Sequence, residues 1–326
     1  MKNTLKYLIS LGIGGGLLYW NFKDANFNEL FSKLATADLR WVYLSAALTF
    51  VAHWSRAIRW KMLIQPLGYE PSTLNTVLAV WCGYFANFII PRAGEVSRCT
   101  VLQKTENIPF EKSFGTVVTE RIFDTITLLV LICINFLLEF DRLSQFFLNF
   151  FEKKLNPTIL TILLIGGIST LSIGVFLYKK YKEKIRQIPI LKKIETLGLG
   201  LVDGLLSIRH LKSPRLFLFH SVFIWTMYYL MAYVLFFAMP QTANLGPLAG
   251  LTILVMGALG TAAPTPGGIG TYHILVGQVV VLYGLTTQDG KLLATFAHGS
   301  GMLTMLIIGG IASLYVLFKT SQKQNT

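Results

Sequence analysis

Long apolar stretches separated by short polar links run along the whole of this chain. Most of them are close to the length of about 20 residues that a helix needs to cross the hydrocarbon core of a bilayer. Hydrophobic residues make up 53% of the 326 residues and charged residues only 14%, which is too apolar a composition for a soluble globular protein. We therefore predict a polytopic membrane protein, with apolar segments at 7–20, 41–64, 74–90, 114–140, 157–178, 214–239, 247–285 and 291–318.

Proline and glycine interrupt the chain at two places, each after an apolar run. The first interruption is PRAGE at 91–95 and the second is PTPGGIG at 264–270. Irregular backbone survives at membrane depth only where protein buries it or a polar cavity lines it, because unpaired amides and carbonyls are costly in lipid. Matching interruptions in two halves of a chain point to a substrate site of the kind that transporters have.

Basic residues set the predicted topology. Ten of the 29 lysines and arginines lie within 179–215, against three acidic residues, so the positive-inside rule places 179–213 in the cytoplasm. With both termini also cytoplasmic, counting gives about six full crossings, with 74–90 entering from the inside and 247–285 from the outside. We predict an all-α protein with two broken, re-entrant segments arranged as an inverted repeat; two short crossings that meet at the Pro-Gly turn also fit the second segment.

The predicted organisation is one transmembrane domain in the cell (inner) membrane. Its first half covers about 1–178, the basic cytoplasmic segment 179–213 and the second half 214–326. The basic segment suits an amphipathic helix on the inner leaflet, and a solvated loop that only fixes topology fits it equally well. Because the net charge of +13 is concentrated there, it indicates membrane topology, and no nucleic-acid partner is expected.

Charged side chains occur within or at the ends of the apolar runs. At about 2.5 to 3.5 kcal/mol for each charge at the bilayer centre, exposing all of them to lipid would be prohibitive. Most must therefore face one another, water or the interface, and we predict that those from residue 92 onward converge on one polar cavity. The candidates are Arg56, Arg59, Arg92, Glu95, Arg98, Glu120, Arg121 and Asp124.

These side chains either lock helices together as internal ion pairs or form a binding site. Five arginines against three carboxylates leave about two positive charges without an internal partner. A guanidinium group is well shaped to bind two oxygens of a phosphate. The set therefore favours a site for a lipid with a phosphate in its headgroup, either a phospholipid or a polyprenyl-phosphate lipid.

The second interruption offers a different kind of anion site. Gly267, Gly268 and Gly270 leave backbone amides uncovered just before a predicted helix, and a helix N-terminus favours an anion. The glycines also suit a purely structural role, in which they allow helices to approach closely. His273 follows the last glycine and joins the candidate site. The spacing of the histidines and cysteines indicates no metal site, and no cofactor is expected.

Taken in order, four motifs resemble the membrane region of lysylphosphatidylglycerol synthases and the flippase-like inner-membrane proteins that share it. They are RAIRW at 56–60, Asn87 followed by PRAGE at 91–95 and Arg98, Glu120-Arg121 with Asp124, and PTPGGIG at 264–270. The resemblance covers nearly the whole chain. It implies that the protein handles a lipid with an anionic or modified headgroup and moves it between leaflets.

Two departures from that family change what we expect. His273 stands where the family often has a glutamate, and the chain ends at Thr326, where the full synthases continue into a soluble aminoacyl-transferase part. We therefore expect a lipid flippase that makes no lysyl-lipid and is not an enzyme. The alternative is an intramembrane enzyme or accessory subunit acting on polyprenyl-phosphate-linked glycan precursors, with Glu95, Glu120, Asp124 or His273 as general base.

Overall fold

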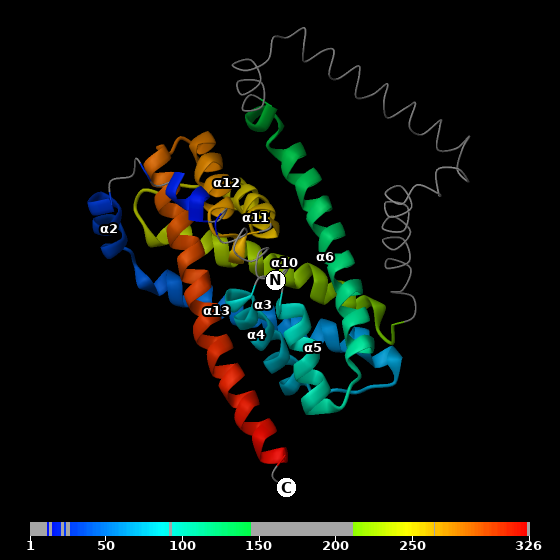
Figure 1. Ribbon diagram of the computed structural model, residues 1–326. Coiled ribbons are helices and arrows are strands. Elements are labelled where there is room, and N and C mark those ends of the chain that lie inside the picture. The colour runs from blue at the N-terminus through cyan, green and yellow to red at the C-terminus, as the bar shows by residue number, and fades with distance from the viewer. Residues whose placement is uncertain are drawn as a thin grey trace, which may run out of the picture. The chain divides into compact units, whose positions relative to one another are not determined.

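The computed structural model describes residues 12, 15–20, 23, 27–90, 93–144, 211–263 and 265–324. The described residues form helices and no strand, which confirms the all-α prediction (Figure 1). The chain divides into two compact units, one made of Met1–Asn135 with His210–Thr326 and one of Phe136–Arg209. The apolar segment predicted at 157–178, residues 179–210 of the basic segment, and half of the segment at 7–20 lie outside the described residues.

In the first half, α2 (Phe27–Ala35) and the long helix α3 (Leu39–Ile64) precede a hairpin of two shorter helices, α4 (Thr73–Ile89) and α5 (Ala93–Glu106). Side chains that precede the helices cap their free amides: Asp38 accepts from the amide of Arg40 and Ser72 from that of Asn75. The short η1 turn (Gln65–Leu67) ends at Gly68, and α6 (Phe110–Leu138) completes the half.

The second half repeats this order of elements. The helix α10 (Pro214–Tyr233) continues into η3 (Val234–Ala238), and α11 (Pro247–Ala262) leads into the second break with its short turn η4 (Pro266–Gly268). After the break come α12 (Thr271–Val279), η5 (Val280–Tyr283) and the long helix α13 (Thr287–Gln324). Thus α3, α4, α5 and α6 correspond in order to α10, α11, α12 and α13, as a repeat requires; the inverted two-fold relation stays a prediction.

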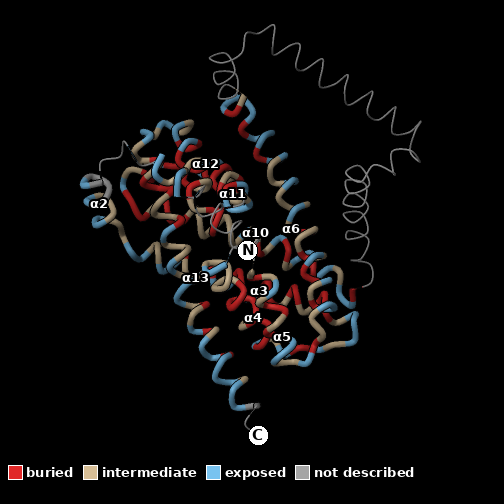
Figure 2. The backbone as a smooth tube through the Cα atoms, viewed as in Figure 1, coloured by how far each residue is buried: buried red, intermediate tan, exposed pale blue. Residues whose placement is uncertain are grey.

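Close packing between pairs of helices holds the unit of Met1–Asn135 and His210–Thr326 together. The helix α3 packs along α10, α4 packs along α5, and α11 packs along α12, while α13 contacts both α4 and α12 (Figure 1). The helix α6 makes few close backbone contacts with the other described helices and is tied to them by side chains. Large hydrophobic side chains are exposed along α6, α10 and α13, as expected of surfaces that face lipid. Figure 2 shows much of α6 and of the C-terminal part of α13 in the colour of exposed residues.

The α4–α5 hairpin is closed by two glycines that face each other. A Cβ atom on Gly83 would lie 2.7 Å from the carbonyl oxygen of Gly94, and one on Gly94 would meet the carbonyl oxygen of Gly83. The amide of Gly94 also donates to Oδ1 of Asn87, 2.7 Å away, so a side chain of α4 satisfies one of the free amides at the start of α5. The backbone beside the first break is therefore fixed by close packing and by a cap.

The tips of the two broken hairpins lie together. A Cβ atom on Gly267 in the second break would lie 4.0 Å from the ring of Phe88 at the end of α4, and 3.9 Å from Met302 of α13. The turn η4 contacts α4 as well. The two tips are therefore in contact through their described residues; Pro91, Arg92 and Pro264 lie outside them.

Three of the described helices are long and apolar enough to cross a membrane: α6, α10 with η3, and α13. The helices α4 and α11 are apolar but have only 17 and 16 residues, about 24 to 26 Å at 1.5 Å per residue, which is less than the hydrocarbon thickness of about 30 Å. The helix α3 has 26 residues but carries Arg40, Arg56, Arg59 and Lys61. The protein is thus a multi-pass membrane protein whose two hairpins are built from short helices.

Candidate functional site

Two arginines of α3 and two carboxylates of α6 form the centre of the predicted cluster. Arg56 and Arg59 are one turn apart, as are Glu120 and Asp124, so each pair shares one helix face. Nε of Arg56 lies 2.6 Å from Oε1 of Glu120, and its Nη2 lies 2.7 Å from Oδ2 of Asp124. Nη2 of Arg59 lies 2.6 Å from Oδ1 of Asp124 and 3.2 Å from Oε1 of Glu120. Each arginine therefore contacts both carboxylates.

Arg98 of α5 adds a third guanidinium to Glu120. Its Nη2 lies 2.7 Å from Oε2 of Glu120, and the guanidinium carbon is 4.5 Å from the centre of the Trp60 ring. The indole of Trp60 donates to Oγ1 of Thr116, 2.9 Å away, which holds the ring in place. Nε of Arg98 is buried and has no hydrogen-bond partner among the described residues. Arg98 is thus paired through one end of its guanidinium only.

This cluster carries a surplus of positive charge among buried side chains. The side chains of Arg56, Arg59 and Arg98 are 5%, 0% and 4% exposed, and Glu120 is fully buried. Three arginines face two carboxylates there, which leaves one positive charge in excess. Removing charges from water is expensive and is offset only by good ion pairing, so an unbalanced buried charge indicates either a structural cost or a missing anion.

A fourth arginine lies at the outer edge of the cluster. Nε of Arg121 lies 2.8 Å from Oε1 of Glu95, and its Nη1 lies 3.6 Å from Asp124. The side chains of Arg121 and Glu95 are 43% and 37% exposed, in contrast to the buried centre. The structure therefore brings together seven of the eight predicted charged residues, and the eighth, Arg92, lies outside the described residues.

Sequence reasoning missed the polar partners of these arginines that are not charged. Nη1 of Arg56 donates to the hydroxyl groups of Tyr84 at 2.6 Å and of Tyr228 at 3.2 Å, and Nη1 of Arg59 donates to Oγ of Ser221 at 3.3 Å. Tyrosines in an apolar run are also typical of the aromatic belts at membrane interfaces. Their spacing does not distinguish a tyrosine of such a belt from one that binds an arginine inside the protein. Two of these partners come from α10, so α10 also contributes to the site.

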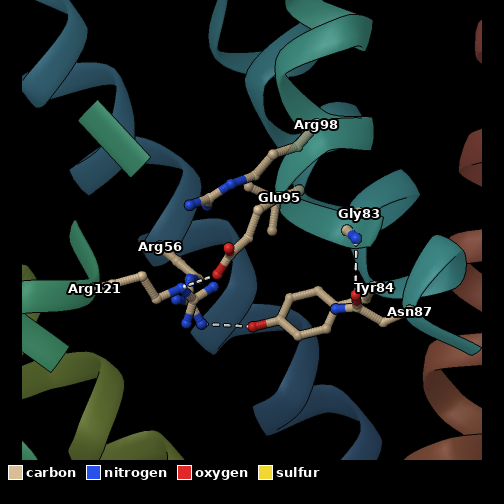
Figure 3. Close-up of a pocket in the computed structure, with 9 residues that line it drawn as sticks. Arg56, Gly83, Tyr84, Asn87, Glu95, Arg98 and Arg121 are labelled. Atoms are coloured by element: carbon tan, nitrogen blue, oxygen red, sulfur yellow. Dashed lines mark hydrogen bonds and ion pairs between the residues drawn. The ribbon is translucent and has the colours of Figure 1, made fainter. Parts of the chain in front are cut away.

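A small pocket opens beside the cluster, between α4, α5 and α6 (Figure 3). Its free space, about 20 Å³, has room for little more than one water molecule. In Figure 3 the carboxylate of Glu95 and the guanidinium of Arg121 point toward each other, and Arg56 reaches the hydroxyl of Tyr84. The pocket is lined by Arg56, Val80, Gly83, Tyr84, Asn87, Gly94, Glu95, Arg98 and Arg121.

The glycines of the second break allow the backbone of the loop to adopt its conformation. Gly267, Gly268 and Gly270 all have positive φ, and a Cβ atom on Gly268 would lie 2.8 Å from Cα of Thr261. The amide of Gly268 donates to the carbonyl of Thr265, 3.2 Å away, which leaves that amide occupied within the loop. Close packing thus explains Gly268. The described contacts do not link the three glycines to the arginine cluster by any hydrogen bond.

His273 and His298 lie next to this loop. Nε2 of His298 donates to the carbonyl oxygen of Gly267, 2.9 Å away, and its ring stacks on Tyr272 with 4.6 Å between ring centres. His273 is buried, and its ring centre is 5.0 Å from that of His298. His298 therefore fixes the second tip from α13.

The sequence that builds this arrangement matches a known family. Residues 7–309 match the model of the family described as Lysylphosphatidylglycerol synthase TM region. The chain belongs to this family. The family is one of membrane proteins, in agreement with the spanning helices and with the resemblance drawn from the motifs.

Curated relatives match over parts of their length. The chain is 35% identical over 101 residues to a UPF0104 membrane protein of Methanocaldococcus jannaschii, which is 30% of either chain. It is 26% identical over 141 residues to a UPF0104 membrane protein of Pyrococcus horikoshii, 42% of this chain and 41% of that one. It is also 32% identical over 103 residues to the glycosyltransferase AglD of Haloferax volcanii, 31% of this chain and 16% of that protein.

The chain thus spans less than half the length of each of these relatives. No solved structure matches it.

Proposed function

We propose that the protein binds the headgroup phosphate of an anionic or headgroup-modified phospholipid and carries the lipid between leaflets. The observation that carries this proposal is the buried cluster in which arginines outnumber carboxylates. Counting the outer pair, four described arginines face three carboxylates, so one positive charge is in excess. A phosphodiester carries one negative charge and would balance it.

Three features support a phosphate in particular. Guanidinium groups bind phosphate oxygens in pairs, and they are less strongly hydrated than ammonium groups, so they suit a site poor in water. Arg121 is partly exposed, so the edge of the cluster can meet a ligand that arrives from outside the protein. The cluster also lies beside the meeting point of two broken hairpins, which is where transporters place their substrates.

We further propose that the described region moves the lipid and does not modify it. The carboxylates of the cluster are all held in ion pairs with arginines, which favours a binding role for them over that of a general base. The concentration of basic residues at 179–215 supports a location in the cell membrane with both termini in the cytoplasm.

The test is lipid transfer in vesicles that contain the purified full chain. Fluorescent phosphatidylglycerol in the inner leaflet becomes accessible to a membrane-impermeant reductant only after it crosses, so the accessible fraction reports transfer. The loss of a charge-assisted contact worth about 1.5 to 3 kcal/mol should slow transfer by about 10-fold or more in Arg121→Gln. The matched control is Lys104→Gln, which removes one exposed positive charge from the last turn of α5.

The proposal predicts transfer by the wild type and by Lys104→Gln, and a marked loss in Arg121→Gln. Equal rates in protein-containing and protein-free vesicles would contradict it. So would transfer that does not depend on Arg121.

A second candidate is a role with polyprenyl-phosphate-linked glycan precursors. It is favoured by the similarity to a protein named as a glycosyltransferase. Such a lipid also presents a phosphate to the arginines, so the same vesicles can be prepared with a fluorescent short-chain polyprenyl phosphate. Transfer of this lipid and not of phosphatidylglycerol would select the second candidate.

A further inference from the structure

Glu95 is the one carboxylate of the cluster that is free to leave it. Glu120 is fully buried and contacts three arginines, and Asp124 contacts both arginines of α3. Glu95, by contrast, is 37% exposed and has one close ionic partner, Arg121. A flexible, partly exposed side chain with one partner can turn away without disturbing the rest of the network.

The backbone that carries Glu95 is held firmly. The neighbouring residue Gly94 packs against Gly83 and its amide donates to Asn87. These contacts fix the first turn of α5 on α4. Rotation of the Glu95 side chain therefore opens the pocket without any movement of the helix.

Glu95 also stands where an anionic ligand would bind. It lines the pocket together with Arg98 and Arg121, and the remaining free space of about 20 Å³ is too small for a phosphate group. Carboxylate and phosphodiester oxygens are both good acceptors for guanidinium groups. If a phosphodiester with one negative charge replaces the carboxylate, the total charge of the cluster does not change.

We infer that Glu95 is a built-in competitor for a phosphate subsite formed by Arg98 and Arg121. In the structure described here its carboxylate fills the subsite on Arg121. When the side chain turns out, the phosphodiester of a ligand takes its place, bound by Arg121 and by the Arg98 guanidinium, whose Nε has no other partner among the described residues. Glu95 thereby sets the threshold for ligand binding and keeps the excess charge of the empty site at one positive charge, where it would otherwise be two. This inference rests on the proposed function, since it takes the ligand to be a phosphate-bearing headgroup.

The test measures binding directly and does not depend on transport. The full chain, purified in a phosphate-free neutral detergent, is titrated by calorimetry with dihexanoyl phosphatidylglycerol and, separately, with inorganic phosphate. In Glu95→Gln the competing charge is gone while the side-chain shape remains, so the affinity should rise by about 10-fold or more, as for release of a charge-assisted contact. Glu95→Ala should show the same direction.

Two further variants make the result specific. Glu111→Gln removes one exposed negative charge from the first turn of α6, outside the cluster, and should bind like the wild type. Adding Arg121→Gln to Glu95→Gln should lower the affinity below that of the wild type. Binding by Glu95→Gln that is no tighter than that of Glu111→Gln would overturn the inference, as would the absence of binding in every variant.

The two ligands separate the possible sources of the phosphate. Tighter binding of the phospholipid alone assigns the subsite to a lipid headgroup, and tighter binding of inorganic phosphate alone assigns it to the free ion. The outcome is also independent of the transport assay. If vesicles show no lipid transfer while Glu95→Gln still binds more tightly, the proposed function is wrong and the subsite stands. If vesicles show lipid transfer while Glu95→Gln binds no more tightly, the subsite is wrong and the proposed function stands.

Discussion

Replacing Glu120 by glutamine should destabilise the protein more than any other single change of charge in the cluster. Glu120 is fully buried, and its two carboxylate oxygens contact Arg56, Arg59 and Arg98 at 2.6, 3.2 and 2.7 Å. Glutamine keeps the size of the side chain and removes its charge. The buried surplus then rises from one positive charge to two, with Asp124 as the remaining carboxylate of the buried centre.

The expected cost is about 3 to 5 kcal/mol, the range found when one partner of a buried ion pair is removed. Since the stability of a domain is typically about 5 to 15 kcal/mol, this is a large fraction of the total. The cost should fall mainly on α6, which has few close backbone contacts and relies on side-chain contacts such as these. Because Glu120 makes three ion pairs, its loss should affect folding as well as ligand binding.

A second substitution tests whether charge imbalance is the cause. Arg98→Met removes the guanidinium that contacts Oε2 of Glu120, so the double variant Arg98→Met with Glu120→Gln returns the buried surplus to one. Directly coupled residues have interaction energies of about 0.5 to 3 kcal/mol, and the double variant should recover stability in that range. The assay is thermal and denaturant unfolding of the purified chain, with Glu111→Gln as the exposed control. A Glu120→Gln variant as stable as that control would refute the reasoning, and so would a double variant less stable than Glu120→Gln.

Three further predictions concern the packing around the site. Gly94→Val should destabilise the protein by about 1 to 3 kcal/mol or more, because a side chain at this position has no room between α4 and α5. Gly115→Ala should be neutral or stabilising in the same unfolding assay, because a Cβ atom on Gly115 would meet nothing within 4 Å. His298→Phe removes the donor to the carbonyl of Gly267, so hydrogen exchange of 267–270 should speed up while that of α4 stays unchanged. Burial alone would raise the pKa of Glu106, yet hydrogen bonds from neighbouring side chains and backbone lower it. The stability that this group contributes is therefore present above its ordinary pKa and is lost as the pH falls through the lowered pKa. In Glu106→Gln the melting temperature should accordingly depend less on pH below about pH 4.

Much of the fold follows from patterns that act locally along the chain. The PRAGE and PTPGGIG motifs mark both breaks because proline and glycine end helices wherever they occur. The charges of α3, α5 and α6 had to meet because lipid excludes them, which is why their convergence could be predicted without knowing the packing. The surplus of arginines follows from a simple count.

Other features depend on contacts between distant segments and leave no local trace. The hydroxyl groups of Tyr84 and Tyr228 reach Arg56 from different halves of the chain, and nothing in their spacing indicates it. The sequence predicted an anion site at the amides of Gly267, Gly268 and Gly270, whereas the contacts of Gly268 with Thr261 and Thr265 give that residue a packing role in the loop. Whether a glycine amide faces a ligand or a neighbouring helix is decided by tertiary packing.

The central claim is that the surplus charge of the arginine cluster binds a lipid phosphate, and the most direct test is native mass spectrometry of the gently extracted full chain. Arg98→Met removes the surplus guanidinium and leaves Glu120 paired with both arginines of α3, so the fold should persist. We predict that the wild type and Lys104→Gln retain a phosphate-bearing lipid and that Arg98→Met retains about 10-fold less of it, as for loss of a charge-assisted contact. Equal retention in all three proteins, or retention of uncharged lipids alone, would contradict the claim.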